Sequence, residues 1–182
     1  MKVMPHIVLG VTGSIAAYKA VELLRVMQRK GWEVSVVMTA GAARFVTPLT
    51  FQTLSRNAVG TGLFDEADGW HPEHIAYADR ATVVVVAPCT ANVIAKMAHG
   101  IADDLLTCTV LATRAPVVVA PAMNDAMWMN AATQANVATL KGRGVTFVDV
   151  ASGELACGRE GVGRFAEGDV IVSVVESVIR RK

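Results

Sequence analysis

The first candidate binding loop follows the first apolar segment of the chain and reads GVTGSIAAYK. Gly10 and Gly13 allow a tight turn, and Ser14 with the free amides of the next helix can hold a phosphate. The glycine spacing is not GxGxxG, and the second apolar segment ends at Thr39 instead of an acidic residue that would bind a ribose 2′-hydroxyl. The loop therefore favours a mononucleotide over a dinucleotide, with a tight turn that binds nothing as the alternative.

A glycine-rich segment near the C-terminus, GELACGREGVGR, carries a second candidate chemistry. Its thiol, Cys157, has Arg159 and Arg164 nearby, and positive charge favours the reactive thiolate. We interpret residues 151–168 as a mobile lid, because polar glycine-rich connections at a ligand edge often close over substrates. An adventitious surface cysteine is the alternative.

Two further motifs each follow a predicted buried strand: PCTAN at residues 88–92 and PAMNDAMW at residues 121–128. An amide at the end of a buried strand is costly unless it has a partner, so Asn124 is expected to meet a ligand there. The apolar residues around it are interpreted as packing that shapes a pocket, with core filling as the alternative: Met123, Met127 and Trp128.

The remaining histidines and cysteines carry weaker signals. His74 lies in the polar stretch GWHPEHIAYADR, where a solvent-exposed histidine is the default expectation. The same default applies to His6, His71 and His99. Because Cys89, Cys108 and Cys157 show no paired spacing, we predict neither a metal site nor a disulfide framework, and we expect Cys108 to be an idle thiol.

Alternating strand and helix patterns separate these segments. Apolar β-branched runs predict strands over residues 6–11, 33–38, 82–87, 117–120, 145–150 and, more weakly, 58–63. Helical patterns cover residues 15–30, capped by Ser14 and Gly31, and residues 91–99, 103–113, 131–143 and 169–180. This alternation predicts an α/β fold, a single doubly wound (Rossmann-like) parallel sheet with helices on both faces. Ligands bind beyond the carboxyl ends of such strands, so the candidate loops should share one edge.

The composition limits the possible partners. The chain has 182 residues, is 53% hydrophobic and carries a net charge of +1. This fits one folded domain over residues 1–182 and gives no electrostatic case for nucleic acid or an anionic membrane. The apolar runs are shorter than the about 20 residues of a membrane span, and the start does not read as a secretory signal. We therefore predict a cytoplasmic protein whose apolar excess is partly buried between subunits.

Together with His74-Ile75, the motifs PCTAN and PAMNDAMW resemble the PASAN and PxMNxxMW motifs of the homo-oligomeric flavin-containing cysteine decarboxylases. The similarity runs from residue 6 to residue 168. Members of this family decarboxylate either phosphopantothenoylcysteine or the C-terminal cysteine of ribosomal peptide precursors. Their active sites lie between the subunits of a trimer, so the resemblance implies a homotrimer, alone or assembled into a dodecamer.

The resemblance also implies roles for individual residues. FMN would be held by loop residues that follow several strands: Gly13, Ser14, Ile15, Thr39, Pro88, Cys89, Thr90, Ala91, Asn92 and Ala122. Asn124 would bind the substrate carboxylate, with Met123 and Arg164 also at the substrate, and His74 would assist decarboxylation. Residues 153–164 resemble the substrate-recognition clamp of the coenzyme A enzymes, in which the cysteine of Ala-Cys-Gly, here Cys157, is the proton donor.

The implied reaction is the FMN-dependent decarboxylation of 4′-phospho-N-pantothenoylcysteine, a small-molecule substrate, to 4′-phosphopantetheine through thioaldehyde and enethiolate intermediates. A peptidyl-cysteine decarboxylase and a non-catalytic FMN-binding regulatory subunit are the alternatives. Cys157 argues against the first, and the lack of a long acidic tail argues against the second. Thr82 and Cys89 depart from the pattern of the family and leave the details of the pocket open. Bacterial relatives often carry a C-terminal synthetase domain, so the chain is either a stand-alone enzyme or half of a bifunctional protein.

Overall fold

A parallel sheet forms the centre of the molecule. The computed structural model describes residues 4–64, 72–154, 158 and 160–181. Six strands pair in the order β3-β2-β1-β4-β5-β6: β1 His6–Val11, β2 Glu33–Met38, β3 Val59–Gly60, β4 Val83–Cys89, β5 Val117–Pro121 and β6 Thr146–Phe147. The strand order reverses between β1 and β4, which is where doubly wound sheets form ligand crevices.

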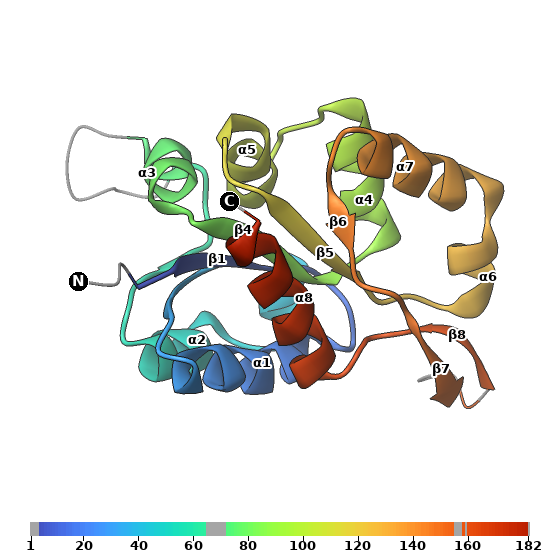
Figure 1. The fold of residues 1–182 in the computed structure, drawn as a ribbon, viewed down its shortest axis with the longest axis horizontal. Helices are drawn as coiled ribbons and strands as arrows, with labels where there is room; N and C mark the ends of the chain where they lie inside the picture. The colour runs from blue at the N-terminus through green and yellow to red at the C-terminus, as the bar shows by residue number, and fades with distance from the viewer. Residues whose placement is uncertain (1–3, 65–71, 155–157, 159, 182) are drawn as a thin grey trace.

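Helices cover both faces of this sheet (Figure 1). One face carries α1 Ala17–Arg29, α2 Pro48–Ser55 and α8 Gly168–Arg180. The other carries α3 Glu73–Arg80, α4 Ala91–His99, α5 Leu105–Ala112 and α7 Ala131–Gly142. Successive side chains of β1 alternate between two apolar cores, with Ile7 and Leu9 in the first and Val8 in the second. The predicted doubly wound fold is confirmed.

The predicted strand bounds fail most clearly at β3, β4 and β6. β3 covers only Val59–Gly60 of the predicted residues 58–63. β6 is only Thr146–Phe147, since its ladder to β5 consists of Val118 with Thr146 and Val119 with Phe147. β4 instead continues past Ala87 to Cys89 and takes in the first two residues of the PCTAN motif. Only Thr90 separates β4 from α4, so the motif is a strand end and a helix start and not an open loop.

Helix α1 begins later than the sequence predicts. Its first helical residue is Ala17, and Ala16 occupies the N-cap position that we expected for Ser14. Gly31 follows the end of the helix as expected, with a φ of +79° that favours glycine. Gly10 does not form a turn: it lies within β1, where a Cβ would come within 2.4 Å of Leu106 Cδ1.

The sequence pattern misses α2, α3, the short helix α6 Asp125–Met129 and the 3₁₀ turn at Ala42–Arg44. It also misses a β-hairpin in the segment interpreted as a lid. There, β7 Ala151–Glu154 pairs antiparallel with β8 Glu160–Arg164. The segment is therefore a two-stranded ribbon beside the sheet and not an irregular loop.

The default expectation of solvent exposure is wrong for His6. This side chain is buried between β1 and β2, with Nδ1 3.2 Å from Glu33 Oε2 and Nε2 3.0 Å from Ser35 Oγ. His99 is exposed as expected, and His71 lies outside the described residues. Within the described part of the chain, none of the helices combines the length and the apolarity that a membrane span requires.

Candidate functional site

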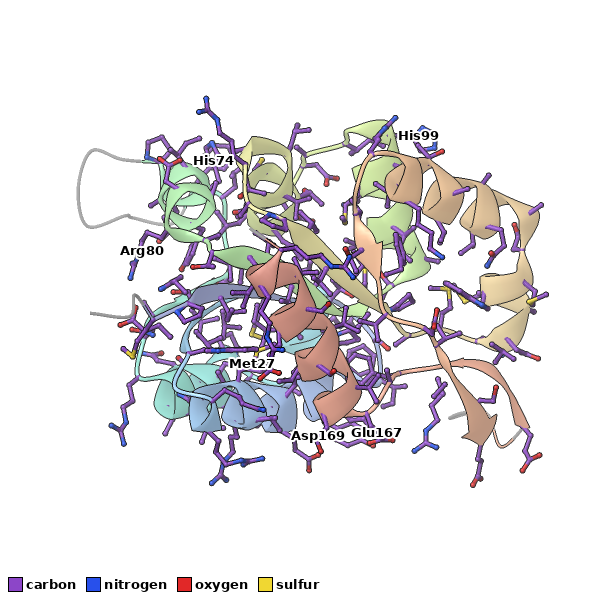
Figure 2. The ribbon with its side chains drawn as sticks, viewed as in Figure 1. Met27, His74, Arg80, His99, Glu167 and Asp169 are labelled. Atoms are coloured by element: carbon purple, nitrogen blue, oxygen red, sulfur yellow. The ribbon has the colours of Figure 1, made fainter. Side chains whose placement is uncertain are left out.

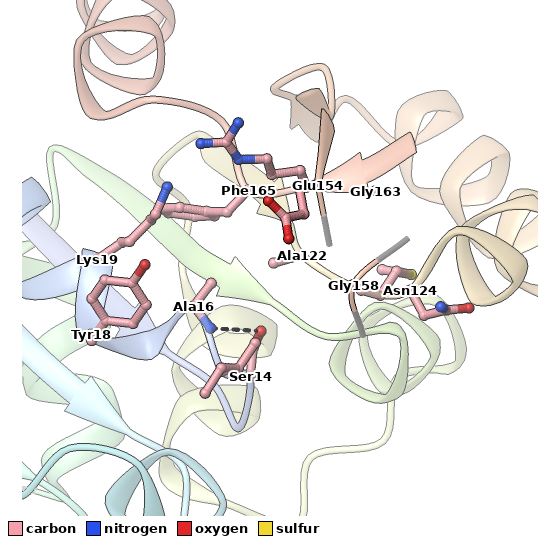
Figure 3. A pocket seen from close by; sticks show the side chains of 13 residues that line it. Ser14, Ala16, Tyr18, Lys19, Ala122, Asn124, Glu154, Gly158, Gly163 and Phe165 are labelled. Atoms are coloured by element: carbon pink, nitrogen blue, oxygen red, sulfur yellow. Dashed lines mark hydrogen bonds between the residues drawn. The ribbon is translucent and has the colours of Figure 1, made fainter. Parts of the chain in front are cut away.

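A cavity of about 710 Å³ opens at the carboxyl edge of the sheet (Figure 3). Its wall comes from the start of α1, the end of β5 and the β7–β8 hairpin with the residue after it: Ser14, Ile15, Ala16, Tyr18, Lys19, Ala122, Met123, Asn124, Glu154, Gly158, Gly163, Arg164 and Phe165. This volume falls in the range of about 300–1,000 Å³ that is typical of small-molecule sites. The cavity lies at the edge where the topology predicts a ligand.

The α1 side of the cavity offers backbone N–H groups. Ser14 N donates to Thr12 O at 2.8 Å, and Ala16 N donates to Ser14 Oγ at 3.2 Å, which fixes the loop before the helix. The first turn of α1, all of which the structure describes, contains no acidic side chain. The positive end of the helix dipole is therefore uncompensated and favours an anion at Ser14 and Ile15.

Gly13 and Thr39 lie behind this wall. A Cβ on Gly13 would come within 3.0 Å of the Gly41 backbone, so the loops after β1 and β2 pack in direct contact. Thr39 Oγ1 accepts a hydrogen bond from Ala42 N at 3.2 Å and so begins the 3₁₀ turn. In this structure Thr39 supports the loop that packs against Gly13 instead of lining the cavity.

The PCTAN residues also support the cavity from behind. Pro88 O accepts from Thr12 Oγ1 at 2.8 Å, and Cys89 O accepts from Ala122 N at 3.0 Å. Thr90 Oγ1 accepts from Val93 N at 3.3 Å and caps α4, whose first turn contains Ala91 and Asn92. Of the residues predicted to hold the cofactor, only Ser14, Ile15 and Ala122 line the cavity, and the others lie outside its wall.

Asn124 lies in the cavity wall, at the end of β5, as predicted. Its Oδ1 accepts a hydrogen bond from Ala126 N at 2.9 Å, which caps α6 and fixes the side-chain amide. The neighbouring Met123 N donates to Gly163 O at 3.0 Å and joins this loop to the hairpin. Met123 also lines the cavity, whereas Met127 is half exposed and does not have the packing role that we expected.

Two cations from different elements meet at one carboxylate on the rim of the cavity. Lys19 Nζ lies 3.7 Å from Glu167 Oε1, and Arg164 Nη2 lies 3.3 Å from the same oxygen. Both Lys19 and Arg164 line the cavity. These three side chains together carry a net charge of +1, and the carboxylate of Glu154 also lines the cavity.

Neither His74 nor Cys157, the other two predicted catalytic residues, is found among the described residues that line the cavity. His74 is half-buried on α3 and is absent from the described wall. Figure 2 shows it well away from Glu167, which contacts the cavity residues Lys19 and Arg164. Cys157 lies outside the described residues, but Gly158, its neighbour in sequence, lines the cavity.

The two described thiols are unlike a reactive cysteine. Cys89 is fully buried in the second core, and burial raises the pKa of its thiol far above the ordinary range. Cys108 Sγ lies 3.2 Å from Ala102 O, and partial burial, followed by the charges of Asp104 and Asp103, raises its pKa as well. Both are expected to stay protonated at neutral pH.

Sequence reasoning misses several residues of the cavity and its support. Lys19 follows Ile15 by four residues, a spacing that would place both on one face of the helix predicted over residues 15–30 and could have identified the lysine. Glu154 and Phe165 lie at the ends of the segment interpreted as a lid, and Tyr18 carried no signal. Thr12 is wholly buried at the end of β1. A threonine directly after an apolar strand was a signal that this residue supports the cavity.

Comparison with known proteins identifies close similarities. A model of the Flavoprotein family matches residues 1–180. The coenzyme A biosynthesis bifunctional protein CoaBC of Vibrio vulnificus (strain YJ016) is 47% identical over 176 residues, which are 97% of this chain and 44% of that protein. The chain thus spans less than half the length of this curated relative.

Two solved structures have the same fold over nearly the whole chain. A PPC decarboxylase mutant complexed with pantothenoylaminoethenethiol gives a TM-score of 0.86 at 33% identity and covers 96% of this chain and 97% of its own. The FMN-dependent cysteine decarboxylase SpaF gives a TM-score of 0.83 at 33% identity, with 97% of this chain and 96% of its own covered.

Proposed function

Because the chain belongs to the Flavoprotein family, we propose that it is an FMN-dependent carboxy-lyase. Its reaction would convert 4′-phospho-N-pantothenoylcysteine to 4′-phosphopantetheine and CO₂ in coenzyme A biosynthesis. The observation that carries this proposal is the cavity wall, in which the start of a helix, one fixed side-chain amide and a pair of cations line the same cavity. The similarity to a PPC decarboxylase and to CoaBC supports the choice of substrate. We also propose that the protein acts in the cytoplasm.

The residues present fit FMN. The amide of Ile15 and the hydroxyl of Ser14 suit its phosphate, because the helix start carries no acidic side chain to repel it, while the Ser14 amide already donates to Thr12 O. Ala122 and Met123 would contact the ring, while Gly13, Thr39 and residues 88–92 would hold the supporting loops in place. When bound, FMN would supply a two-electron oxidant for the substrate thiol, which gives the departing CO₂ an electron sink, and the reduced cofactor would return the two electrons to the decarboxylated product.

The chain's own groups would position the substrate and move its protons. The amide of Asn124 would donate to the substrate carboxylate, and it can do so without charge repulsion because it is neutral. The Cys157 thiol would protonate the enethiolate carbon, a role supported by the place of Gly158 in the cavity wall. His74 would assist the loss of CO₂.

The paired cations support a phosphorylated substrate over a peptide. A phosphate monoester is doubly charged, and Lys19 and Arg164 share only one carboxylate. Figure 3 places Lys19 and Asn124 on opposite sides of the cavity. A substrate whose carboxylate lies at Asn124 would extend its phosphate toward Lys19, and a peptide C-terminus has no such group.

A homotrimer, alone or assembled into a dodecamer, would account for the position of His74. Since His74 lies away from the cavity of its own chain, it would enter the cavity of a neighbouring copy. Exposed apolar side chains occur beside both places and suit such a contact. Ile15 and Tyr18 are 57% and 56% exposed at the cavity, and Ile75, next to His74, is 38% exposed.

Purified protein reconstituted with FMN and incubated with 4′-phospho-N-pantothenoylcysteine tests the proposal. We expect a yellow protein and a product of the mass of 4′-phosphopantetheine. Turnover of a peptide with a C-terminal cysteine, but not of this substrate, would favour a peptidyl-cysteine decarboxylase. FMN binding without release of CO₂ from either would favour a regulatory subunit.

The contribution of a neighbouring copy can be tested by mixing two inactive variants. We expect His74→Asn and Asn124→Asp each to abolish turnover. Equal amounts, unfolded and refolded together, should regain about a quarter of the wild-type rate, since a random pair of neighbours combines an intact His74 with an intact Asn124 about once in four. A mixture without activity would place both residues in one chain's site, and wild-type activity of His74→Asn alone would remove His74 from the reaction.

A further inference from the structure

We propose that Thr12 is a positioning residue for the flavin, an inference that rests on the proposed function. Its side chain is fully buried between the end of β1 and the end of β4. Thr12 Oγ1 donates to Pro88 O at 2.8 Å and accepts from Thr90 N at 3.0 Å. The hydroxyl thus holds both neighbours of Cys89 at once.

The Thr12 hydroxyl makes its hydrogen bonds just beyond the point where the ladder between β1 and β4 ends. β1 and β4 pair in register from Ile7 with Val83 to Gly10 with Val86. Beyond that point one long backbone bond remains, from Thr12 N to Pro88 O at 3.3 Å. A hydroxyl both donates and accepts, so one side chain can add a second, shorter bond to Pro88 O and also accept from Thr90 N. An apolar side chain of the same shape would leave Pro88 O with the long backbone bond alone and would remove the acceptor for Thr90 N.

Thr12 is also the first of a series of ties around the cavity. It joins the loop before α1 to the loop before α4. Cys89 O then accepts from Ala122 N at 3.0 Å, and Met123 N donates to Gly163 O at 3.0 Å. In this series Thr12 is the link that sets the distance between the α1 amides and the end of β5. The phosphate and ring ends of one FMN molecule would contact these two places, so their spacing should decide its affinity.

The test compares FMN affinity in variants that keep or remove the hydroxyl. Thr12→Val preserves the shape of the side chain but removes the two buried hydrogen bonds of the hydroxyl. It should therefore raise the Kd for FMN, measured by flavin fluorescence quenching, about tenfold or more. The visible absorption bands of bound flavin should also shift in Thr12→Val at saturating FMN. Thr12→Ser should restore an affinity within about threefold of wild type, because it keeps the hydroxyl.

Thr109 offers a matched control. It is equally buried, and its Oγ1 donates to Leu105 O at 2.7 Å inside α5, away from the flavin loops. Thr109→Val should lower the unfolding temperature and leave the Kd for FMN within about threefold of wild type. If Thr12→Val lacks the wild-type circular dichroism spectrum, Thr12→Ala is judged by the same criteria.

Wild-type affinity in a folded Thr12→Val protein, or weak binding in Thr12→Ser equal to that in Thr12→Val, would overturn the role of Thr12. The readout is separate from the reaction. If wild-type protein binds FMN but does not release CO₂ from 4′-phospho-N-pantothenoylcysteine, the proposed function fails, and the affinity series still decides the role of Thr12. If wild-type protein does not bind FMN, both proposals fail.

Discussion

The two sides of the cavity are built in different ways. On the β1–β4–β5 side, Thr12, Cys89 and Ala122 are buried and joined by short hydrogen bonds through Pro88, Thr90 and the backbone. On the opposite side, the hairpin β7–β8 is a two-stranded ribbon, and Val162 is 40% exposed. The hairpin is tied to the segment after β5 by Met123 N to Gly163 O, and Arg164 at its end pairs with Glu167, the N-cap residue of α8.

This difference separates what is fixed before ligands bind from what can adapt to them. A cofactor that stays bound needs walls whose polar groups are already satisfied, and the sheet side provides them. A substrate that must enter and leave needs a wall held by few contacts, and the described residues of the hairpin have few to the sheet. Substitutions on the sheet side should therefore change FMN affinity first, and those on the hairpin side should change substrate turnover first.

The largest effect is expected from Gly163→Ala. Gly163 has a φ of +126°, and a Cβ there would come within 2.5 Å of Met123 O, so the hairpin must move away from the end of β5. We expect kcat/KM to fall about 100-fold or more, since displacement of a substrate-binding wall is costly, while the Kd for FMN stays within about threefold. Steady-state kinetics and flavin fluorescence measure the two quantities.

Gly144→Ala is the control for this substitution. Gly144 also has a positive φ, +89°, but open space surrounds the place of its Cβ, away from the cavity. It should lower the free energy of unfolding by about 1 kcal/mol and leave both kinetics and FMN affinity unchanged. Equal losses of FMN affinity and turnover in Gly163→Ala would contradict the independence of the two sides.

A smaller effect is expected from Lys19→Gln, at the rim where the two sides meet. Removal of the charge should raise KM about tenfold and leave kcat and FMN affinity within about twofold, because the lysine would bind the substrate phosphate and not the reacting atoms. Lys30→Gln is the matched control, since Lys30 Nζ pairs with Glu176 Oε1 at 3.0 Å on the helices α1 and α8, outside the cavity wall. A fall in kcat at unchanged KM in Lys19→Gln would contradict the assignment.

The sheet side and the hairpin side also differ in how well the sequence predicted them. The strands β1 and β2 were predicted to the residue, because buried β-branched runs have few alternatives. The hairpin was missed because its strands, ASGE and EGVGR, have neither apolar alternation nor β-branched enrichment. Its pairing depends on backbone geometry at glycines, and sequence pattern read such a segment as a loop.

Prediction of the site was limited for a related reason. Asn124 and Ser14 were predicted from their places at strand ends, and both line the cavity. Thr39 and residues 88–92 were also at strand ends but lie behind the wall. The hydroxyls of Thr39 and Thr90 bond within their own turns, and the carbonyls of Pro88 and Cys89 bond to neighbouring loops. Sequence position gives the edge of the sheet on which a residue lies. Which side chain faces the ligand depends on packing between loops that are distant in sequence.

The smallest effect is expected in the pH dependence of stability, and it tests how well the sheet side excludes water. Burial raises the pKa of the Cys89 thiol, so the folded protein keeps a proton that the unfolded chain loses above about pH 8.5. The unfolded state then binds fewer protons than the folded state, and stability falls as the pH rises above that value, by at most about 1.4 kcal/mol per pH unit for this one group.

Cys89→Ala should therefore lose less stability than wild type between pH 8.5 and pH 10, as measured by urea unfolding at each pH. At pH 7.5 the variant is expected to be less stable by about 1 kcal/mol, because a buried sulfur is removed, and this deficit should shrink as the pH rises. Cys108→Ala should reduce the loss of stability between pH 8.5 and pH 10 by less than Cys89→Ala does, because Cys108 is only partly buried. Parallel curves for wild type and Cys89→Ala would mean that water reaches the thiol, and the sheet side would then be no better sealed than the hairpin.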